Sequence, residues 1–184
     1  MNEFGARWAI AGGWAIDLFL GFPTRPHADV DIAVLRRDQH RLRARLEGAL
    51  VSKVAARRLS PWGSEELLVS PVHEVHARWT DGAHLEFLLN EDDPVSAEWV
   101  YRRDARIRRS LDDTFHHNGE FPYLAPEVVL LYKSKAPGPK DEADFTSVRP
   151  RLTSEQCKWL REAIASLSPA HRWVEILVQE PYDR

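Results

Sequence analysis

The sequence predicts an α+β protein in which strands and helices mix up to residue 124 and helices alone follow. Three observations support this. Val30, Ile32 and Val34 alternate with other residues, as in a strand with one buried face. Leucines recur every fourth position between residues 42 and 50, as on one face of a helix. From Pro126 onward, helix-start signals replace strand patterns. We therefore expect one domain over residues 1–124 and a helical domain over 125–184.

The first elements form a strand, turn, helix and strand in sequence. A short apolar run predicts a buried strand, and the two glycines after it predict a tight turn. Gly21 fits the C-terminal stop of the helix that follows. The predicted order is a strand over 7–11, a turn at Gly12-Gly13, a helix over 14–20, a loop over 22–27 and a strand over 29–35.

The remaining elements before residue 124 are mostly strands. We expect a helix over 38–50, strands over 53–59, 66–72 and 84–90, a strand or hairpin over 99–109 and a short strand over 121–124. His116-His117 has no ligands at sensible spacing nearby and is interpreted as a loop.

Four helices are expected after residue 124. Pro126 suits a first helical position, and that helix should end near Lys135, before Pro137. A second helix is predicted over 140–148. Thr153 and Gln156 have the spacing of a capping box, which starts a third. A fourth should begin at Ser168-Pro169 and end before Pro181.

Composition narrows the class of protein. Of 184 residues, 43% are hydrophobic and 29% are charged, as in ordinary globular proteins. Cys157 is the single cysteine, so an intrachain disulfide is excluded. No apolar run approaches the ~20 residues of a membrane helix, and no signal-peptide pattern begins the chain, so we expect a cytoplasmic protein without a membrane partner.

Charge gives no general attraction for nucleic acid, because the net charge is -3. Nucleic acid is therefore an unlikely partner. Basic residues do gather between Arg102 and Arg109. This run is typical of a solvated strand face, and a phosphate-binding surface is the alternative.

The chemistry is concentrated near Asp29 and Asp31. Carboxylates two positions apart on a strand point to the same face and repel one another unless a cation joins them. Mg²⁺ suits such a pair and leaves positions for water and phosphate. Gly12 and Gly13 at a helix start would let a phosphate approach backbone N–H groups. Either motif alone is common in a strand edge or a turn, but together in this order they are more specific.

The stretch GGWAIDLFLGFPTRPHADVDIAV resembles the motif of the DNA polymerase β-like nucleotidyltransferase superfamily, and most of all its aminoglycoside 2″-adenylyltransferases. The resemblance is dense over residues 11–35 and thin elsewhere. It implies a short mixed sheet with flanking helices, followed by a helical bundle. It also implies two Mg²⁺ ions, an NTP donor with ATP as the family default, and in-line transfer to a hydroxyl of a small acceptor, releasing pyrophosphate.

The resemblance assigns roles to individual residues. Asp29 and Asp31 correspond to metal ligands, and Gly12 and Gly13 to the turn on the phosphate side. The family uses a third carboxylate on a later strand, as metal ligand or acceptor base. Glu86 is the candidate, although family members often have Asp there, and a surface glutamate is the alternative.

Related proteins also use a lysine of a C-terminal helix on the nucleotide phosphates. Lys133 and Lys135 are the candidates here. Asp141 and Asp144 share a helix face, where they would orient the lysine, face a cationic acceptor or serve only as first-turn acids.

Several residues and functions stay open. Arg25 and His27 are interpreted as structural, and the acids over 91–93 as a polar loop, with an acidic rim for a polycationic acceptor as the alternative. The alternative acceptors are a lincosamide, an RNA end or a protein, and a non-catalytic nucleotide-binding homologue is the remaining option. Sequence indicates neither the nucleobase nor the oligomeric state.

Overall fold

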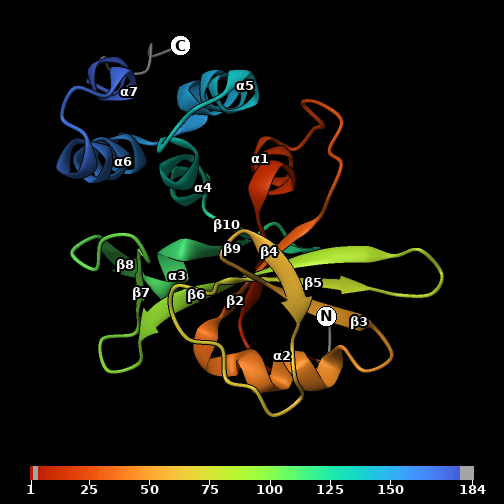
Figure 1. Cartoon of the computed structure of the whole chain (residues 1–184). Coiled ribbons are helices and arrows are strands. Elements are labelled where there is room, and N and C mark those ends of the chain that lie inside the picture. The colour runs from red at the N-terminus through yellow and green to blue at the C-terminus, as the bar shows by residue number, and fades with distance from the viewer. Residues whose placement is uncertain (2–3, 179–184) are drawn as a thin grey trace.

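A computed structural model describes residue 1 and residues 4–178 of the chain. Its strands belong to one mixed sheet, in the order β4-β3-β5-β6-β2-β1-β10-β9, with β7 and β8 paired beside β6 (Figure 1). The strands are β1 (Trp8–Ile10), β2 (Asp31–Leu35), β3 (Leu50–Ala55), β4 (Arg58–Pro61), β5 (Glu74–Arg78), β6 (His84–Asp93), β7 (Glu98–Val100), β8 (Arg108–Ser110), β9 (Phe115–His117) and β10 (Pro122–Leu124). Two pairs are parallel, β2 with β6 and β1 with β10.

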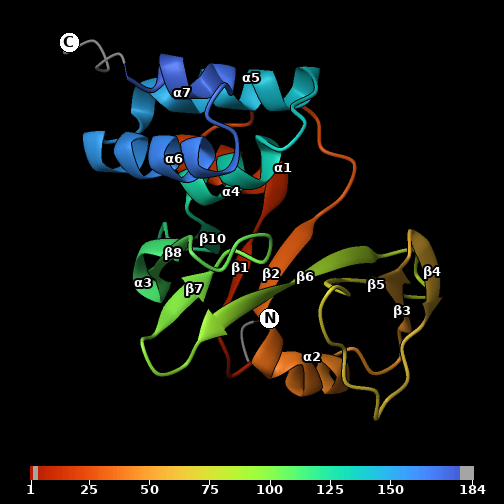
Figure 2. The same ribbon diagram turned by 60° about the vertical axis from the view of Figure 1, so that its left-hand side comes forward.

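Helices cover both faces of the sheet, which confirms the predicted α+β fold. They are α1 (Gly12–Leu20), α2 (Gln39–Arg45), α3 (Leu111–Thr114), α4 (Pro126–Lys133), α5 (Pro139–Val148), α6 (Ser154–Leu167) and α7 (Arg172–Ile176), with 3-10 turns at Arg36–Asp38 and Arg149–Arg151. Figure 2 shows α1 on the same side of the sheet as the C-terminal helices, with α2 on the opposite side. None of the described helices is long and apolar enough to cross a membrane.

Two apolar clusters hold these layers together. One lies between the sheet and the helices α1 and α4–α7, and it joins Ile16 and Leu20 to Leu130, Leu160 and Trp173. The other lies under the opposite face, where Leu42 and Leu46 pack on Phe87. Because the first cluster draws side chains from α1 as well as from α4 and α6, the predicted boundary at residue 124 divides the sequence but not the core.

Several helices and strands begin or end where short sequence motifs predicted. Gly21 ends α1 in the left-handed conformation, with φ +82°, and its N–H donates to the carbonyl of Asp17. The Thr153–Gln156 capping box starts α6, with both reciprocal hydrogen bonds formed. The strand or hairpin expected over 99–109 is β7 paired antiparallel with β8. The last helix was expected to begin at Ser168-Pro169, but α7 begins at Arg172, and it ends at Ile176, before Pro181 as predicted.

The strand predicted over 66–72 is wrong, and the strand of this region is β5, a few residues later. The backbone of the segment bonds to side chains instead of a neighbouring strand. Leu68 N–H donates to Gln39 Oε1 (2.6 Å), and the Leu68 carbonyl accepts from Gln39 Nε2 (3.1 Å) and Arg36 Nη1 (3.2 Å). Pro71 also lacks the N–H that a ladder needs.

Three other boundaries differ from the prediction. The helix expected to reach residue 50 ends at Arg45, and Leu50 opens β3 with 70% of its surface exposed. The strand expected over 53–59 is a hairpin, because Ala56 and Arg57 both take positive φ between β3 and β4. The loop expected at His116-His117 is part of β9.

Candidate active site

Asp31 and Glu86 lie side by side in the middle of the sheet. They are register partners on the parallel strands β2 and β6, so their side chains share one face. Asp29 was expected inside the strand, but β2 begins at Asp31 and Asp29 is exposed just before it. Pairing with β6 still extends to Val30, whose carbonyl accepts from the Glu86 N–H (3.1 Å). The strand therefore brings two of the three predicted carboxylates together and places the third at its entrance.

These carboxylates repel one another. Burial, followed by the charges of Asp29, Glu86 and Glu74, raises the pKa of Asp31 to about 6, and Lys133 opposes the shift. A cation between the carboxylates would relieve this repulsion. The donor set, all carboxylate oxygen, is one that Mg²⁺ prefers. The residues present therefore fit a divalent metal ion.

The double glycine brings the start of α1 against Asp31. Gly12 has φ +60°, and a Cβ atom there would collide with Asp31 Oδ2. A Cβ atom on Gly13 would collide with the His27 ring and lie 2.7 Å from Arg25 Nη2. Glycine is therefore required at position 12 for the contact with β2, and at position 13 for the contact with the loop that follows α1.

The loop between α1 and β2 is held by Asp17, which is buried in α1. Its carboxylate accepts from the Thr24 N–H (3.0 Å) and hydroxyl (2.6 Å), and His27 Nε2 lies 2.7 Å from it. Burial raises the pKa of Asp17, but these hydrogen bonds outweigh it and the pKa is lowered overall. The arrangement supports a structural role for His27 and fixes the loop that leads to Asp29.

Lys133 sits at the centre of a charged network between α4 and α5. Its Nζ lies 2.8 Å from both Asp141 Oδ1 and Asp144 Oδ2. Asp144 is only 1% exposed and also accepts two hydrogen bonds from Arg25, each 3.1 Å long. Of the roles considered for the two aspartates, orienting the lysine agrees with these contacts. Lys135 is exposed in the turn that follows α4.

A cavity of about 430 Å³ connects these parts. Gly12 and Asp31 line one side, and Lys133, Lys135 and Asp141 line another. The remaining wall includes Arg102 and Arg103 of the basic run, and three residues that were not predicted as site residues: His73, Asn90 and Tyr132. Asp29, Glu86 and Gly13 are not among the lining residues.

The basic run over 102–109 divides into two parts. Arg102 and Arg103 stack over the Tyr132 ring at 5.4 and 5.5 Å from its centroid, at the cavity wall. The other three arginines form ion pairs away from it: Arg106 with Asp104, Arg108 with Asp93 and Arg109 with Glu127. Arg102 and Arg103 thus line the cavity, where phosphate binding stays a prediction, and Arg109 is only 11% exposed, so the predicted solvated face does not include it. The sequence did offer a signal for this part of the wall, because Arg102 directly follows Tyr101 and lies close to Trp99 in the chain.

The acids at the end of β6 are strand residues, so the predicted polar loop over 91–93 is wrong. Each forms an ion pair with an arginine: Glu91 with Arg36 (2.7 Å), Asp92 with Arg37 (2.8 Å) and Asp93 with Arg108 (3.0 Å). Their negative charge is largely neutralised within the protein.

A family model described as aminoglycoside-2''-adenylyltransferase matches residues 1–114, which include the glycine turn and all three candidate carboxylates. The chain belongs to this family. It is therefore an adenylyltransferase-family enzyme, that is, a nucleotidyltransferase. Nucleotidyltransferases of this kind are typically metal-dependent. A comparison with curated proteins gives no match.

Two solved structures share the fold of this adenylyltransferase-family chain. The solution structure of the antibiotic-resistance factor ANT(2'')-Ia has a TM-score of 0.56 and 20% identity, over 92% of this chain and 87% of that one. The crystal structure of the lincosamide antibiotic adenylyltransferase LnuA with lincomycin bound has a TM-score of 0.55 and 16% identity, over 80% of this chain and 89% of that one. At these identities the match concerns the fold alone.

Proposed function

We propose that this enzyme transfers AMP from ATP to a hydroxyl of an aminoglycoside and releases pyrophosphate. The observation that carries the proposal is the register of Asp31 and Glu86 on adjacent parallel strands, with the Gly12 turn packed against Asp31. Asp31 and Gly12 both line the cavity, which supports a carboxylate for the metal ion and a helix start for the phosphates acting on one bound triphosphate.

Asp29, Asp31 and Glu86 are the residues that would hold Mg²⁺. When bound there, Mg²⁺ would neutralise charge on the triphosphate and favour the in-line displacement at the α-phosphorus. The raised pKa of Asp31 agrees with this assignment, because crowded carboxylates gain most from a cation.

The chain's own groups would bind and orient the donor. The first N–H groups of a helix have no intrahelical acceptor, so Gly12 and Gly13 at the start of α1 offer donors to phosphate oxygens. Lys133, held by Asp141 and Asp144, supplies a fixed positive charge on the facing wall, and Lys135 adds a second one nearby. Together they would offset part of the negative charge of the triphosphate, and the bound metal ion would offset more of it.

Glu86 would act on the acceptor. As the acceptor oxygen forms its bond to the α-phosphorus, its proton passes to the Glu86 carboxylate, and the bond from the α-phosphorus to the bridging oxygen breaks. Pyrophosphate carries the electron pair away. Glutamate extends one methylene farther than the aspartate common in the family, and the parallel register with Asp31 keeps its carboxylate at the same face.

A lincosamide is the second candidate acceptor, and the charge of the cavity favours it. Four basic residues line the cavity against two acids, and the ion pairs of β6 neutralise the acids expected to attract a polycation. The basic wall repels an aminoglycoside with several amines more than a lincosamide with fewer.

Pyrophosphate release tests both proposals. Each NTP is incubated with Mg²⁺ and, separately, an aminoglycoside, a lincosamide, an RNA oligonucleotide or no acceptor. We expect release to require ATP and an antibiotic, and to fall at least 100-fold in Asp29→Asn, a loss on the scale of removing a group that stabilises the transition state. Asp112→Asn is the matched control, because that side chain is 89% exposed and its ion pair contributes little.

The panel also separates the alternatives. Release that depends on a lincosamide alone selects the second candidate, and release that depends on RNA contradicts both. Full activity in Asp29→Asn contradicts the metal assignment. A chain that binds ATP with Mg²⁺ but transfers it to no acceptor contradicts the proposed reaction in favour of a nucleotide-binding homologue.

A further inference from the structure

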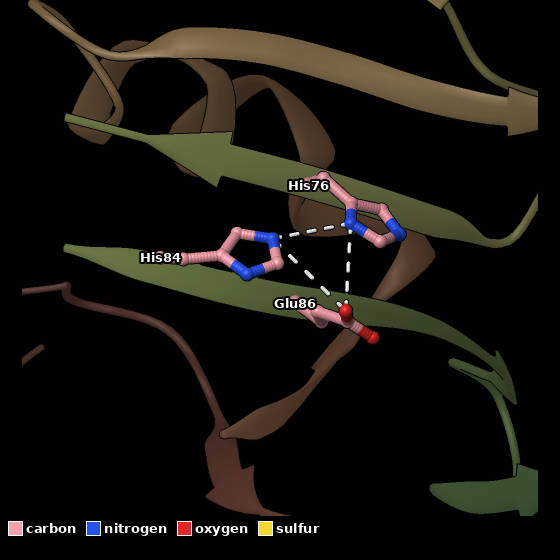
Figure 3. Close-up of side chains that lie close together, drawn as sticks. All are labelled: His76, His84 and Glu86. Atoms are coloured by element: carbon pink, nitrogen blue, oxygen red, sulfur yellow. Dashed lines mark hydrogen bonds and ion pairs between the residues drawn. The ribbon is translucent and has the colours of Figure 1, made fainter. Parts of the chain in front are cut away.

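Three side chains of types that can bind a metal ion converge on one face of the sheet beside the proposed active site. His76 lies on β5, and His84 and Glu86 lie on β6 (Figure 3). His84 and Glu86 are two positions apart, so both point to the same face. His76 is the antiparallel register partner of Glu86, which brings it to that face as well. Strand pairing alone therefore assembles the cluster.

The distances suit a single ion. His76 Nδ1 lies 3.2 Å from His84 Nε2 and 3.5 Å from Glu86 Oε1, and His84 Nε2 lies 4.0 Å from Glu86 Oε1. Ligand atoms placed about 2.1 Å from a tetrahedral Zn²⁺ are about 3.4 Å from one another. The three atoms thus need little movement to enclose an ion.

A second carboxylate orients one of the histidines. His76 Nε2 lies 2.7 Å from Glu74 Oε1, which holds the proton on Nε2 and leaves Nδ1 unprotonated toward the cluster. A carboxylate behind a metal-binding histidine is a common support of zinc sites. The three cluster side chains are 15%, 28% and 19% exposed, so an ion can enter from solvent.

We propose that His76, His84 and Glu86 bind a divalent transition-metal ion, with Zn²⁺ as the best match, and leave a fourth position for water. Two imidazole nitrogens select such an ion over Mg²⁺, which prefers oxygen ligands. Glu86 belongs to both sites. Bound Zn²⁺ holds Glu86 toward β5 and withdraws it from Asp31. It therefore inhibits nucleotide transfer, a consequence that rests on the proposed function.

Calorimetric titration of the metal-free full chain with Zn²⁺, without nucleotide, tests the site. We expect one equivalent to bind. His84→Gln should weaken the binding at least 100-fold, because a ligand is lost. Glu74→Gln should weaken it about 10- to 100-fold, because the support of a ligand is lost. His40→Gln is the control and should bind as the wild type does, since His40 is an exposed residue of α2.

Co²⁺ provides a second readout that does not depend on affinity. Its visible absorption in the wild-type chain should have the intensity of a four-coordinate site and should be lost in His84→Gln. Absence of a bound equivalent in the wild type, or equal Zn²⁺ affinity in His84→Gln, would overturn the proposal and leave a hydrogen-bonded pair of stacked histidines.

Inhibition is tested separately, in buffers that fix free Zn²⁺ in the presence of ATP. The rate of nucleotide transfer without Zn²⁺, divided by the rate with Zn²⁺, should exceed ten for the wild type and approach one for His84→Gln. Equal ratios would overturn the shared role of Glu86. Asp29→Asn should lose transfer and keep the Zn²⁺ titration, so failure of the proposed reaction is distinguishable from failure of the zinc site.

Discussion

Replacing Asp31 with asparagine should stabilise the metal-free protein while abolishing transfer. Burial and the neighbouring acids raise the pKa of Asp31 from 3.8 to about 6. The folded chain therefore holds this proton more tightly than the unfolded chain, and stability falls as the pH rises from about 4 through 6. At ~1.4 kcal/mol per pKa unit, the ionised group costs about 3 kcal/mol above that range. Asparagine removes this cost.

Thermal unfolding in EDTA, followed by circular dichroism, measures the effect. For a chain of this size, about 3 kcal/mol corresponds to an increase of Tm of roughly 6–12 °C at pH 8. At pH 4 the difference should disappear, because Asp31 is then protonated in the wild type. Asp29→Asn is the control, and its Tm should increase less, because Asp29 is exposed. Mg²⁺ should stabilise the wild type and not Asp31→Asn. A variant that unfolds at or below the wild-type Tm at pH 8 would refute this reasoning.

The remaining predictions concern other parts of the site and its support. Gly12→Ala should abolish transfer and lower the free energy of unfolding by about 1–3 kcal/mol, because of the positive φ and the collision with Asp31. Gly21 has a similar φ but lies in open space, so Gly21→Ala is the control and should retain activity. Denaturant unfolding and rate measurements compare the two variants. Lys133→Ala should raise KM for ATP at least tenfold, because two aspartates hold Lys133 in place. Lys135→Ala should raise it less, because Lys135 is exposed. Similar KM values for the two variants would contradict this difference. Arg109→Ala should destabilise the fold by about 3–5 kcal/mol in urea, since it leaves the buried glutamate of α4 without its ion pair, and a change below 1 kcal/mol would argue against that pair.

Features that depend on neighbouring residues could be predicted from the sequence. The Gly21 stop and the Thr153 capping box follow from backbone chemistry within a few positions, whereas the two glycines expected to form a turn are the first residues of α1. The candidate carboxylates could also be predicted, because Asp29 and Asp31 are two positions apart and Glu86 lies in a recognisable strand. Their roles stay predictions, as does the division of the chain at residue 124.

Features that depend on long-range pairing could not be predicted in the same way. Residues 66–72 have strand composition, but their backbone bonds to Gln39 from α2, which no local pattern reveals. The cavity wall formed by Arg102 and Arg103 depends on where Tyr132 packs. The cluster of His76 with His84 and Glu86 likewise required the register of β5 on β6.

The position of β1 in the sheet has a consequence for how the chain folds. Ile10 pairs with Tyr123 of β10, so one edge of β1 receives its neighbour only after most of the chain has been synthesised. Closing so long a loop is entropically costly, and sheets rich in such contacts fold slowly. Until β10 arrives, β1 presents an open, apolar edge to other nascent chains. We therefore expect the yield of soluble protein to depend on translation rate, temperature and chaperone supply more strongly than the stability of the finished fold would suggest.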